Sequence, residues 1–302
     1  MGTFSRMRSL IIGMGIGALY KKVLTELGHQ VITVDRDMNK QAGYYDLDAA
    51  LVDYGSFDCA VICTPNFTHY SIAQQIAARC KIVFVEKPGV KTASEWNNLV
   101  YSNKFTRFMM VKNNQYRSNF ATFKNLADNA AVIDLRWVNY DRVPNPGTWF
   151  TNKELAFGGV SRDLMPHLLS YITALYPNVM NDYYVTEKIF KQRWQLSDVT
   201  NTDYGRVDPN GVYDVDDYAK LTFKINNITI QLIADWRSQS INDQCIQFLM
   251  KPVNKLVNFE LGLCPEDAYK RMIETAINNI ANNEFWANEL KQDLWIHEMI
   301  NA

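Results

Sequence analysis

Short apolar runs without polar alternation recur through the first part of the chain, with amphipathic segments between them. Runs of this kind are typical of strands in a parallel sheet, because helices cover both faces of such a sheet. Their alternation with helical segments predicts βαβ units and a doubly wound Rossmann sheet of the α/β class. The predicted strands are 9–12, 30–34, 59–63, 82–85 and 108–111, and the predicted helices are 19–27, 48–52, 70–78 and 94–101.

After Asn113 the pattern changes, because strand now follows strand without an intervening helix. Asn226-Asn227 separates two of these strands and is typical of a tight hairpin turn. This part predicts an α+β domain with a largely antiparallel open sheet. The expected domains are 1–115 and 116–302, with the C-terminal helices as candidates to pack back on the first. The second part has predicted strands 132–140, 183–190, 218–225, 228–234 and 246–250, and predicted helices 120–127, 158–175, 265–282 and 284–300.

Length and composition fit two globular domains, since 302 residues allow about 150 residues for each. The formal net charge of −1 and the mixed charges argue against nucleic-acid binding and against a polybasic membrane patch. No apolar run reaches the roughly 18 residues of a membrane span, and glycines interrupt the run at 10–20 that superficially resembles a signal peptide. The five cysteines are odd in number and form no C-x-x-C pair, which argues against a disulfide framework and against a zinc site. Unpaired cysteines favour the reducing cytoplasm as the compartment.

The segment Gly13-Met14-Gly15-Ile16-Gly17-Ala18 follows a predicted strand and opens a predicted helix. Gly13 would permit the tight turn, Gly15 would let the backbone approach a pyrophosphate, and Ala18 would allow close helix–strand packing. The helix amides and the positive end of the helix dipole would then face the phosphates. The segment predicts dinucleotide binding, and a purely structural glycine turn is the alternative.

The next predicted strand ends at Asp35, about twenty residues after the glycines, as the dinucleotide motif requires. A carboxylate there accepts hydrogen bonds from ribose hydroxyls and repels a 2′-phosphate, so NAD is the expected cofactor. Arg36 keeps NADP possible, because its guanidinium could pair with the phosphate or stack on the adenine. A solvated surface charge is the alternative for Arg36.

Two further motifs, Thr64-Pro65-Asn66-Phe67-Thr68-His69 and Glu86-Lys87-Pro88, follow predicted strands. Together with the glycine segment they resemble the Gfo/Idh/MocA family of NAD(P)-dependent oxidoreductases, most clearly over residues 8–176. The resemblance implies a Rossmann domain joined to a C-terminal domain whose open sheet often forms the oligomer interface. A homodimer or homotetramer is therefore expected.

The resemblance also assigns roles around the cofactor. It implies that the loop Thr64–Asn66 borders the ribose and adenine side, with His69 as either a cofactor contact or a packing residue. It implies that Glu86 and Lys87 lie near the nicotinamide ribose, with Pro88 fixing the turn, often through a cis peptide. Both motifs follow strands of the presumed parallel sheet, and ligands bind beyond the carboxyl ends of such strands. A surface position is the alternative for Lys87.

Gly158-Gly159 precedes Asp163 and His167, and the resemblance implies that this order marks an active site. A spacing of four places both side chains on one helix face. His167 suits removal of a hydroxyl proton near neutral pH, Asp163 could orient it or hold substrate, and Lys87 could stabilise the reacting oxygen. A solvated ion pair or a buried structural histidine is the alternative. Pro166 should kink this helix or mark its true start.

The loop 139–150 contains Arg142 and Trp149, which are candidate substrate residues. The loop resembles that of relatives that oxidise nucleotide-linked sugar acids. Those relatives carry further polar residues before the Gly-Gly, where this chain has Leu155-Ala156-Phe157. Because of this difference, the likeness implies only that the substrate is a carbohydrate-like small molecule and does not identify the compound.

These features together predict an NAD(P)-dependent dehydrogenase that acts on a secondary alcohol or ketone of a sugar, polyol or nucleotide sugar. Other family members use the same scaffold to retain NAD for elimination or epimerisation, to reduce imines or bilins, or only to sense a cofactor. The presence of Lys87, Asp163 and His167 favours an enzyme over a sensor.

Overall fold

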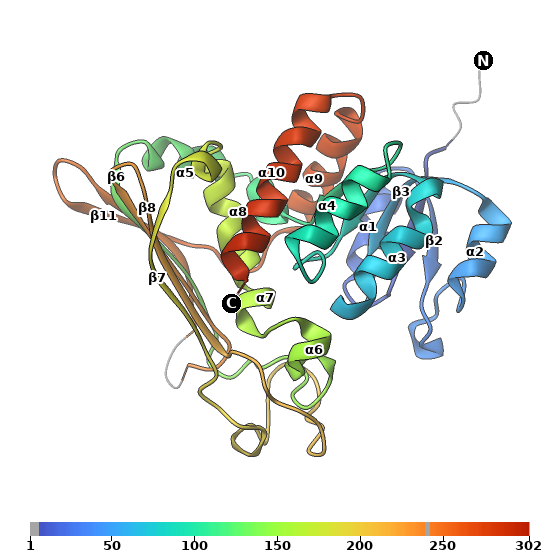
Figure 1. The fold of residues 1–302 in the computed structure, drawn as a ribbon, viewed down its shortest axis with the longest axis horizontal. Coiled ribbons are helices and arrows are strands. Elements are labelled where there is room, and N and C mark those ends of the chain that lie inside the picture. The colour runs from blue at the N-terminus through green and yellow to red at the C-terminus, as the bar shows by residue number, and fades with distance from the viewer. Residues whose placement is uncertain (1–5, 239–241, 302) are drawn as a thin grey trace. The chain divides into compact units, whose positions relative to one another are not determined.

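The first sheet consists of five parallel strands in the order β2-β1-β3-β4-β5 (Figure 1). This computed structural model describes residues 6–238 and 242–301. The parallel sheet with helices between its strands confirms the predicted Rossmann fold. Its elements are β1 (Arg8–Ile12), α1 (Gly17–Glu26), β2 (Gln30–Val34), α2 (Leu47–Tyr54), β3 (Phe57–Ile62), α3 (His69–Ile76), β4 (Cys80–Val85), α4 (Ala93–Ser102) and β5 (Arg107–Met110).

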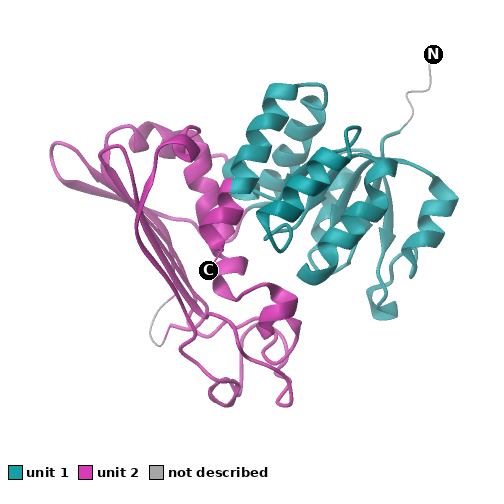
Figure 2. Ribbon diagram, viewed as in Figure 1, with its two compact units in different colours: residues 1–116, 265–294 teal, residues 117–264, 295–302 magenta. Residues whose placement is uncertain are grey.

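The chain divides into two units, which Figure 2 shows in different colours. Unit 1 contains residues 1–116 and 265–294, and unit 2 contains residues 117–264 and 295–302. Unit 1 therefore includes α9 (Glu266–Asn278) and the first part of α10 (Asn283–Ile300). These helices complete an apolar cluster on one face of the parallel sheet, whose members include Ile11, Tyr20, Leu24, Val61, Phe84, Met109, Met272, Ile273 and Trp286.

The second sheet lies in unit 2 and has six strands in the order β11-β10-β6-β9-β8-β7. Neighbouring strands are antiparallel except β6 and β9, which run parallel. The predicted α+β domain with a largely antiparallel sheet is confirmed, but the sequence did not indicate the parallel pair or β11. The strands are β6 (Ala130–Val138), β7 (Tyr184–Lys191), β8 (Tyr218–Ile225), β9 (Ile228–Asp235), β10 (Asp243–Met250) and β11 (Lys255–Glu260).

One face of this second sheet is covered by helices of unit 2, namely α5 (Phe120–Ala127), α7 (Val160–Asp163) and α8 (Met165–Leu175). Figure 1 shows α5 and α8 together on that side. The opposite face carries polar side chains, including the ion pairs Arg136–Asp134 and Lys220–Glu187.

The predicted helix over 158–175 is in fact two helices. α7 ends at Asp163, α8 begins at Met165, and Pro166 occupies the first turn of α8. Proline is favoured there because its missing N–H would have no partner within the helix. The prediction that Pro166 marks a true helix start is confirmed. Within the described part of the chain, no helix combines the length and the hydrophobicity needed to cross a membrane.

Candidate cofactor site and active site

The glycine segment forms a tight turn between β1 and α1. Gly13 has φ +92°, and a Cβ on it would lie 2.7 Å from the backbone carbonyl of Cys63. A Cβ on Gly17 would lie 2.9 Å from Ile11 Cγ2, so Gly17 allows the close approach of helix and strand. The prediction that Ala18 has this role is wrong, because the Ala18 side chain is exposed. Gly15 is exposed, and nothing would lie within 4 Å of an added Cβ, which leaves its backbone open to a ligand.

Asp35 lies beside this turn, half-buried at the end of β2. Its Oδ2 accepts a hydrogen bond of 2.6 Å from the Met14 amide, and its Oδ1 accepts one of 2.8 Å from the Asp37 amide. Two amide donors fix the orientation of the carboxylate, and each oxygen retains a lone pair for another donor. Arg36 and Ile16 are exposed on the same rim. This donor and acceptor set suits the phosphates and ribose of a dinucleotide.

His69 begins α3 and is fully buried. Its Nδ1 lies 2.7 Å from the carbonyl oxygen of Gly89, and its Nε2 lies 2.7 Å from that of Thr64. Burial lowers the pKa of His69, and the charge of Lys87 adds to this effect, whereas the two carbonyl contacts oppose it. The ring therefore connects the loop Thr64–Asn66 with the loop that follows β4, which is the packing role considered from the sequence.

Glu86 and Lys87 are half-buried at the carboxyl end of β4, and the Lys87–Pro88 peptide is cis, as the family resemblance implied. Glu86 Oε1 accepts a hydrogen bond of 2.7 Å from the hydroxyl of Tyr20 on α1. Burial raises the pKa of Tyr20 well above its usual value, and the charge of Glu86 raises it further. Tyr20 was not identified from the sequence, because an aromatic residue inside a helix pattern is typical of a core position.

Asp163 is the last residue of α7, and its Oδ2 accepts a hydrogen bond of 2.9 Å from Nε1 of Trp236. The start of α7 is held by Asp216, whose carboxylate accepts the amides of Gly159 at 2.9 Å and Ser161 at 2.7 Å. A Cβ on Gly159 would lie 1.8 Å from the carbonyl oxygen of Asp216, so only glycine fits there. This contact explains the second glycine of the Gly-Gly that precedes the predicted site.

His167 lies on α8, one turn beyond Asp163, and is half-buried. Its ring stacks on the indole of Trp137, with centroids 5.4 Å apart and an interplanar angle of 30°. Trp137 pairs with Ala234 in the parallel register of β6 and β9, so Trp137 and Trp236 come from the ends of adjacent strands. Each member of the Asp163–His167 pair thus has an aromatic neighbour in unit 2 that the sequence did not indicate.

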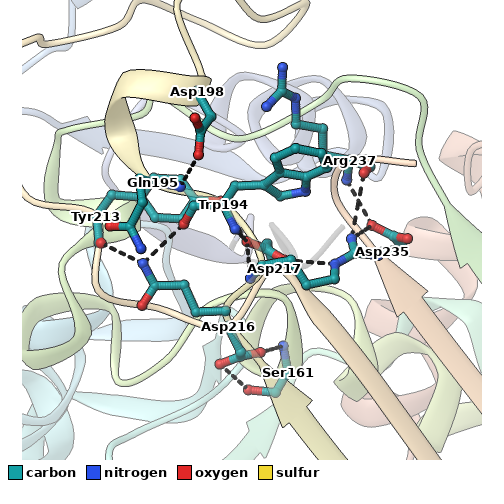
Figure 3. Close-up of polar contacts among 11 residues, drawn as sticks. Ser161, Trp194, Gln195, Asp198, Tyr213, Asp216, Asp217, Asp235 and Arg237 are labelled. Carbon is teal, nitrogen blue, oxygen red and sulfur yellow. Dashed lines mark hydrogen bonds and ion pairs between the residues drawn. The ribbon is translucent and has the colours of Figure 1, made fainter. Parts of the chain in front are cut away.

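Charged residues surround the strand ends that carry Trp236. The Asp217 carboxylate accepts the amides of Arg193 and Trp194, and the Arg193 guanidinium pairs with both Asp217 and Asp235. Figure 3 shows this network together with the contact between Asp216 and Ser161. The network fixes the segments on either side of the Trp236 indole.

Of the two substrate candidates, Arg142 lies in a loop of unit 2 and Trp149 begins a short 3-10 helix there. The Arg142 guanidinium lies over the ring of Tyr204 at 4.7 Å, and the Arg142 amide donates a hydrogen bond of 2.9 Å to the carbonyl oxygen of Trp236. Trp149 stacks on Phe150 with ring centroids 3.9 Å apart. Arg142 is thus adjacent in the fold to the Asp163–Trp236 contact, and Trp149 belongs to a separate aromatic pair.

The structure therefore forms two groups of residues. Unit 1 brings the glycine turn, Asp35, the loop Thr64–Asn66, Glu86 and Lys87 to the region beyond the carboxyl ends of its strands. Unit 2 brings Asp163 and His167 onto adjoining helical turns. Within the described residues, no cluster of three or more His, Cys, Asp or Glu side chains is arranged to hold a metal ion.

The group of candidate residues in unit 1 lies in a part of the chain that matches a known family. Residues 8–107 match the model of the GFO_IDH_MocA oxidoreductase family, described as having an NAD-binding Rossmann fold. This match covers about a third of the chain, within unit 1. The resemblance predicted from the three motifs is thereby confirmed, as is the prediction of NAD as the cofactor.

Several named proteins are similar over longer stretches. A UDP-kanosamine synthase oxidoreductase subunit, so named in Amycolatopsis mediterranei, is 26% identical over 199 residues, which are 62% of this chain and 53% of that protein. The chain thus spans about half the length of this relative. The crystal structure of GenD2 from gentamicin A biosynthesis, in complex with NAD, has a TM-score of 0.74 at 18% identity and covers 99% of this chain and 93% of its own. The structure of levoglucosan dehydrogenase, in complex with NADH and levoglucosan, has a TM-score of 0.72 at 15% identity. This match covers 98% of this chain and 96% of the levoglucosan dehydrogenase chain. These two structures share the fold of both units.

Proposed function

We propose that the protein is an NAD(P)-dependent dehydrogenase that interconverts a secondary alcohol and a ketone of a sugar, polyol or nucleotide sugar. The observation that carries this proposal is the Asp163–His167 pair, in which a carboxylate and an imidazole are each supported by a tryptophan. A surface ion pair would have no need of such support. The names of the similar proteins, which refer to levoglucosan, gentamicin A and UDP-kanosamine, favour a carbohydrate-like substrate.

The residues of the chain would divide the chemistry as follows. The open backbone of Gly15 would hold the pyrophosphate of the cofactor, and the Asp35 carboxylate, which the Met14 amide orients, would accept the ribose hydroxyls. When bound, the nicotinamide ring supplies the hydride acceptor or donor. His167 would accept the hydroxyl proton of the substrate, which requires a base within about 3 Å of that oxygen or one bridging water.

The other two polar groups would position the substrate. Lys87 is positively charged and would donate a hydrogen bond to the reacting oxygen, which stabilises the negative charge that develops there. Asp163 would accept a hydrogen bond from a substrate hydroxyl or orient the imidazole. The proposal requires that Lys87 of unit 1 acts in the same reaction as Asp163 and His167 of unit 2.

The test is an absorbance assay at 340 nm with NAD or NADP and a panel of free sugars, anhydrosugars, polyols, amino sugars and nucleotide sugars. The proposal expects NADH to accumulate with one member of this panel. Substrate conversion without a net absorbance change, by protein that purifies with bound NAD, would instead favour elimination or epimerisation. Tight cofactor binding without any conversion would contradict the proposal.

A further inference from the structure

The contact between Trp236 and Asp163 has the features of a built support. Trp236 is only 1% exposed, and its indole N–H donates a hydrogen bond to the Asp163 carboxylate. An indole N–H is a donor and cannot accept, so it can hold Asp163 only through a carboxylate oxygen. Hydrogen bonds to charged groups are about twice as strong as those between neutral groups. The bond therefore restricts which oxygen of Asp163 remains available for a further donor.

The backbone on both sides of Trp236 is also fixed. Its amide donates a hydrogen bond of 3.0 Å to the carbonyl oxygen of Asp217, and its carbonyl accepts the amide of Arg142. Each neighbour of Trp236 in the chain is ion-paired, since Asp235 pairs with Arg193 and Arg237 pairs with Asp141 at 3.0 Å. The indole thus projects from a segment with little freedom to move.

Asp163 and Trp236 are anchored to the same dipeptide. The Asp216 carboxylate holds the first turn of α7, which ends at Asp163, and the Asp217 carbonyl holds the amide of Trp236 (Figure 3 shows Asp216 and Asp217). Asp217 itself is fully buried. A common anchor fixes the separation of donor and acceptor, which is what orienting a single carboxylate requires.

We infer that Trp236 is a positioning residue that fixes the Asp163 carboxylate for the dehydrogenase reaction, and this inference rests on the proposed function. Trp236 need not touch the substrate, because its effect passes through Asp163. Loss of the indole N–H would remove one of the contacts that orient the carboxylate and would lower the fraction of molecules in the productive arrangement.

The first test is a double-mutant cycle on kcat/KM. Trp236→Phe keeps an aromatic ring and removes the donor, and it should lower kcat/KM about tenfold, the effect of losing a hydrogen bond to a charged group. In an Asp163→Ala background the same change should alter kcat/KM less than about twofold, because the acceptor is already absent. An equal loss in both backgrounds would indicate general structural damage and overturn the inference.

A matched control is available in Trp286, whose Nε1 donates a bond of the same 2.9 Å length to the carbonyl oxygen of Asn279 in unit 1. Trp286→Phe should leave kcat/KM per folded molecule unchanged. If Trp286→Phe lowers kcat/KM as much as Trp236→Phe does, the effect is not specific to Asp163, and the inference fails.

The second test needs neither turnover nor a substrate. The protein has seven tryptophans, so its indole N–H resonances can be resolved by 15N NMR and assigned through the phenylalanine variants. Asp163→Ala should move the Trp236 resonance and leave that of Trp286 in place, whereas Asp163→Asn keeps a carbonyl acceptor and should move it less. An unmoved Trp236 resonance in Asp163→Ala would overturn the inference. If the resonance moves but the unmodified protein converts no substrate, the proposed function fails while the contact itself stands.

Discussion

The hydroxyl of Tyr20 donates a hydrogen bond of 2.7 Å to Oε1 of Glu86. Tyr20 belongs to the helix that follows the glycine turn, and Glu86 belongs to the Glu-Lys-Pro motif. Two candidate cofactor motifs that are far apart in the sequence are therefore connected by one partly buried hydrogen bond.

Removal of this hydroxyl should affect both stability and cofactor binding. Tyr20→Phe should lower the free energy of unfolding by about 1–3 kcal/mol, because Oε1 of the half-buried Glu86 loses the Tyr20 donor. It should also raise the Kd for NAD several-fold. Tyr44→Phe is the matched control, since Tyr44 donates a bond of the same length to Asp53 at an exposed site. Thermal denaturation and fluorescence titration check both variants, and equal effects in the two would count against a special role for Tyr20.

Cofactor preference should depend on Asp35. We expect NAD to bind more tightly than NADP, because the Asp35 carboxylate accepts ribose hydroxyls and repels a 2′-phosphate. Asp35→Ser should narrow or reverse the ratio of the two Kd values, since Arg36 could then pair with the phosphate. Asp37→Ser, which changes an exposed carboxylate two residues away, should leave the ratio unchanged. A tenfold preference of the unmodified protein for NADP, about 1.4 kcal/mol, would refute this reading of Asp35.

Removal of His167 should affect turnover much more than it affects cofactor binding. His167→Ala should lower kcat by about two to four orders of magnitude, the usual contribution of a general base, with little change in the Kd for NAD. Lys87→Ala should lower kcat and weaken NAD binding as well, and Asp163→Asn should act mainly on KM. His29→Ala removes a buried histidine that contacts Ser9 and serves as the control. Full activity of His167→Ala would remove His167 from the mechanism.

Stability should depend on pH through a buried cluster in unit 1. Lys112 forms ion pairs with Glu289, at 2.9 Å, and with Asp293, whose Oδ2 also accepts the Met110 amide. Burial raises the pKa of Asp293 to about 7, with the charge of Glu289 adding and that of Lys112 opposing. The pKa in the unfolded chain is about 3.9, so the folded protein binds more protons between about pH 4 and pH 7.

The difference in proton binding between the folded and unfolded states determines how stability changes with pH. The contribution of Asp293 to the free energy of unfolding is largest below about pH 4, decreases as the pH rises through about 7, and is lost above it. Asp293→Asn should flatten this slope, and Asp267→Asn on the exposed side of α9 should not. Urea unfolding between pH 4 and pH 8 measures the effect. Parallel slopes for the unmodified protein and Asp293→Asn would show that Asp293 does not titrate in this window.

Assembly should use the polar face of the second sheet. We expect a symmetric dimer or tetramer, because closed symmetry is the usual outcome for such oligomers. Lys220→Glu would place a negative charge beside Glu187, its present partner, and should shift the mass toward the monomer. Lys81→Glu, at a comparable ion pair with Asp58 in unit 1, should leave the mass unchanged. Light scattering at micromolar concentration decides this, and a monomeric unmodified protein would contradict the prediction.

Local features of the fold could be predicted wherever one short segment determines the structure. The turn at Asn226 has φ +52° and joins β8 to β9 as the Asn-Asn pair indicated. Pro166 lies in the first turn of α8, because the missing N–H of a proline is tolerated there. The strand β11 was missed, since its largely exposed residues give little hydrophobic pattern. The parallel pairing of β6 with β9 was also missed, because strand order depends on contacts between residues far apart in the chain.

The same distinction applies to the candidate site. Gly13, Asp35 and Lys87 stand in motifs with fixed spacing, so the sequence alone was enough to propose them as candidates. Trp236 could not be identified in this way, because it is linked to Asp163 by a contact across 73 residues. Asp216 gave a weak signal as one of two adjacent aspartates immediately before a strand. Adjacent acidic residues at such a position are more often solvated than buried, so the pattern did not indicate an anchor.

The order of elements along the chain has a consequence for how the protein is made. Met272, Ile273 and Trp286 belong to the apolar cluster of unit 1, but 148 residues of unit 2 separate them from the end of β5 and the short segment after it. At 5–20 residues per second, a ribosome needs about 7–30 s to synthesise that interval. During this time Tyr20 and Leu24 lack the side chains that later cover them. Nascent chains stalled shortly after residue 264 should therefore recruit chaperones more strongly than chains released from the ribosome.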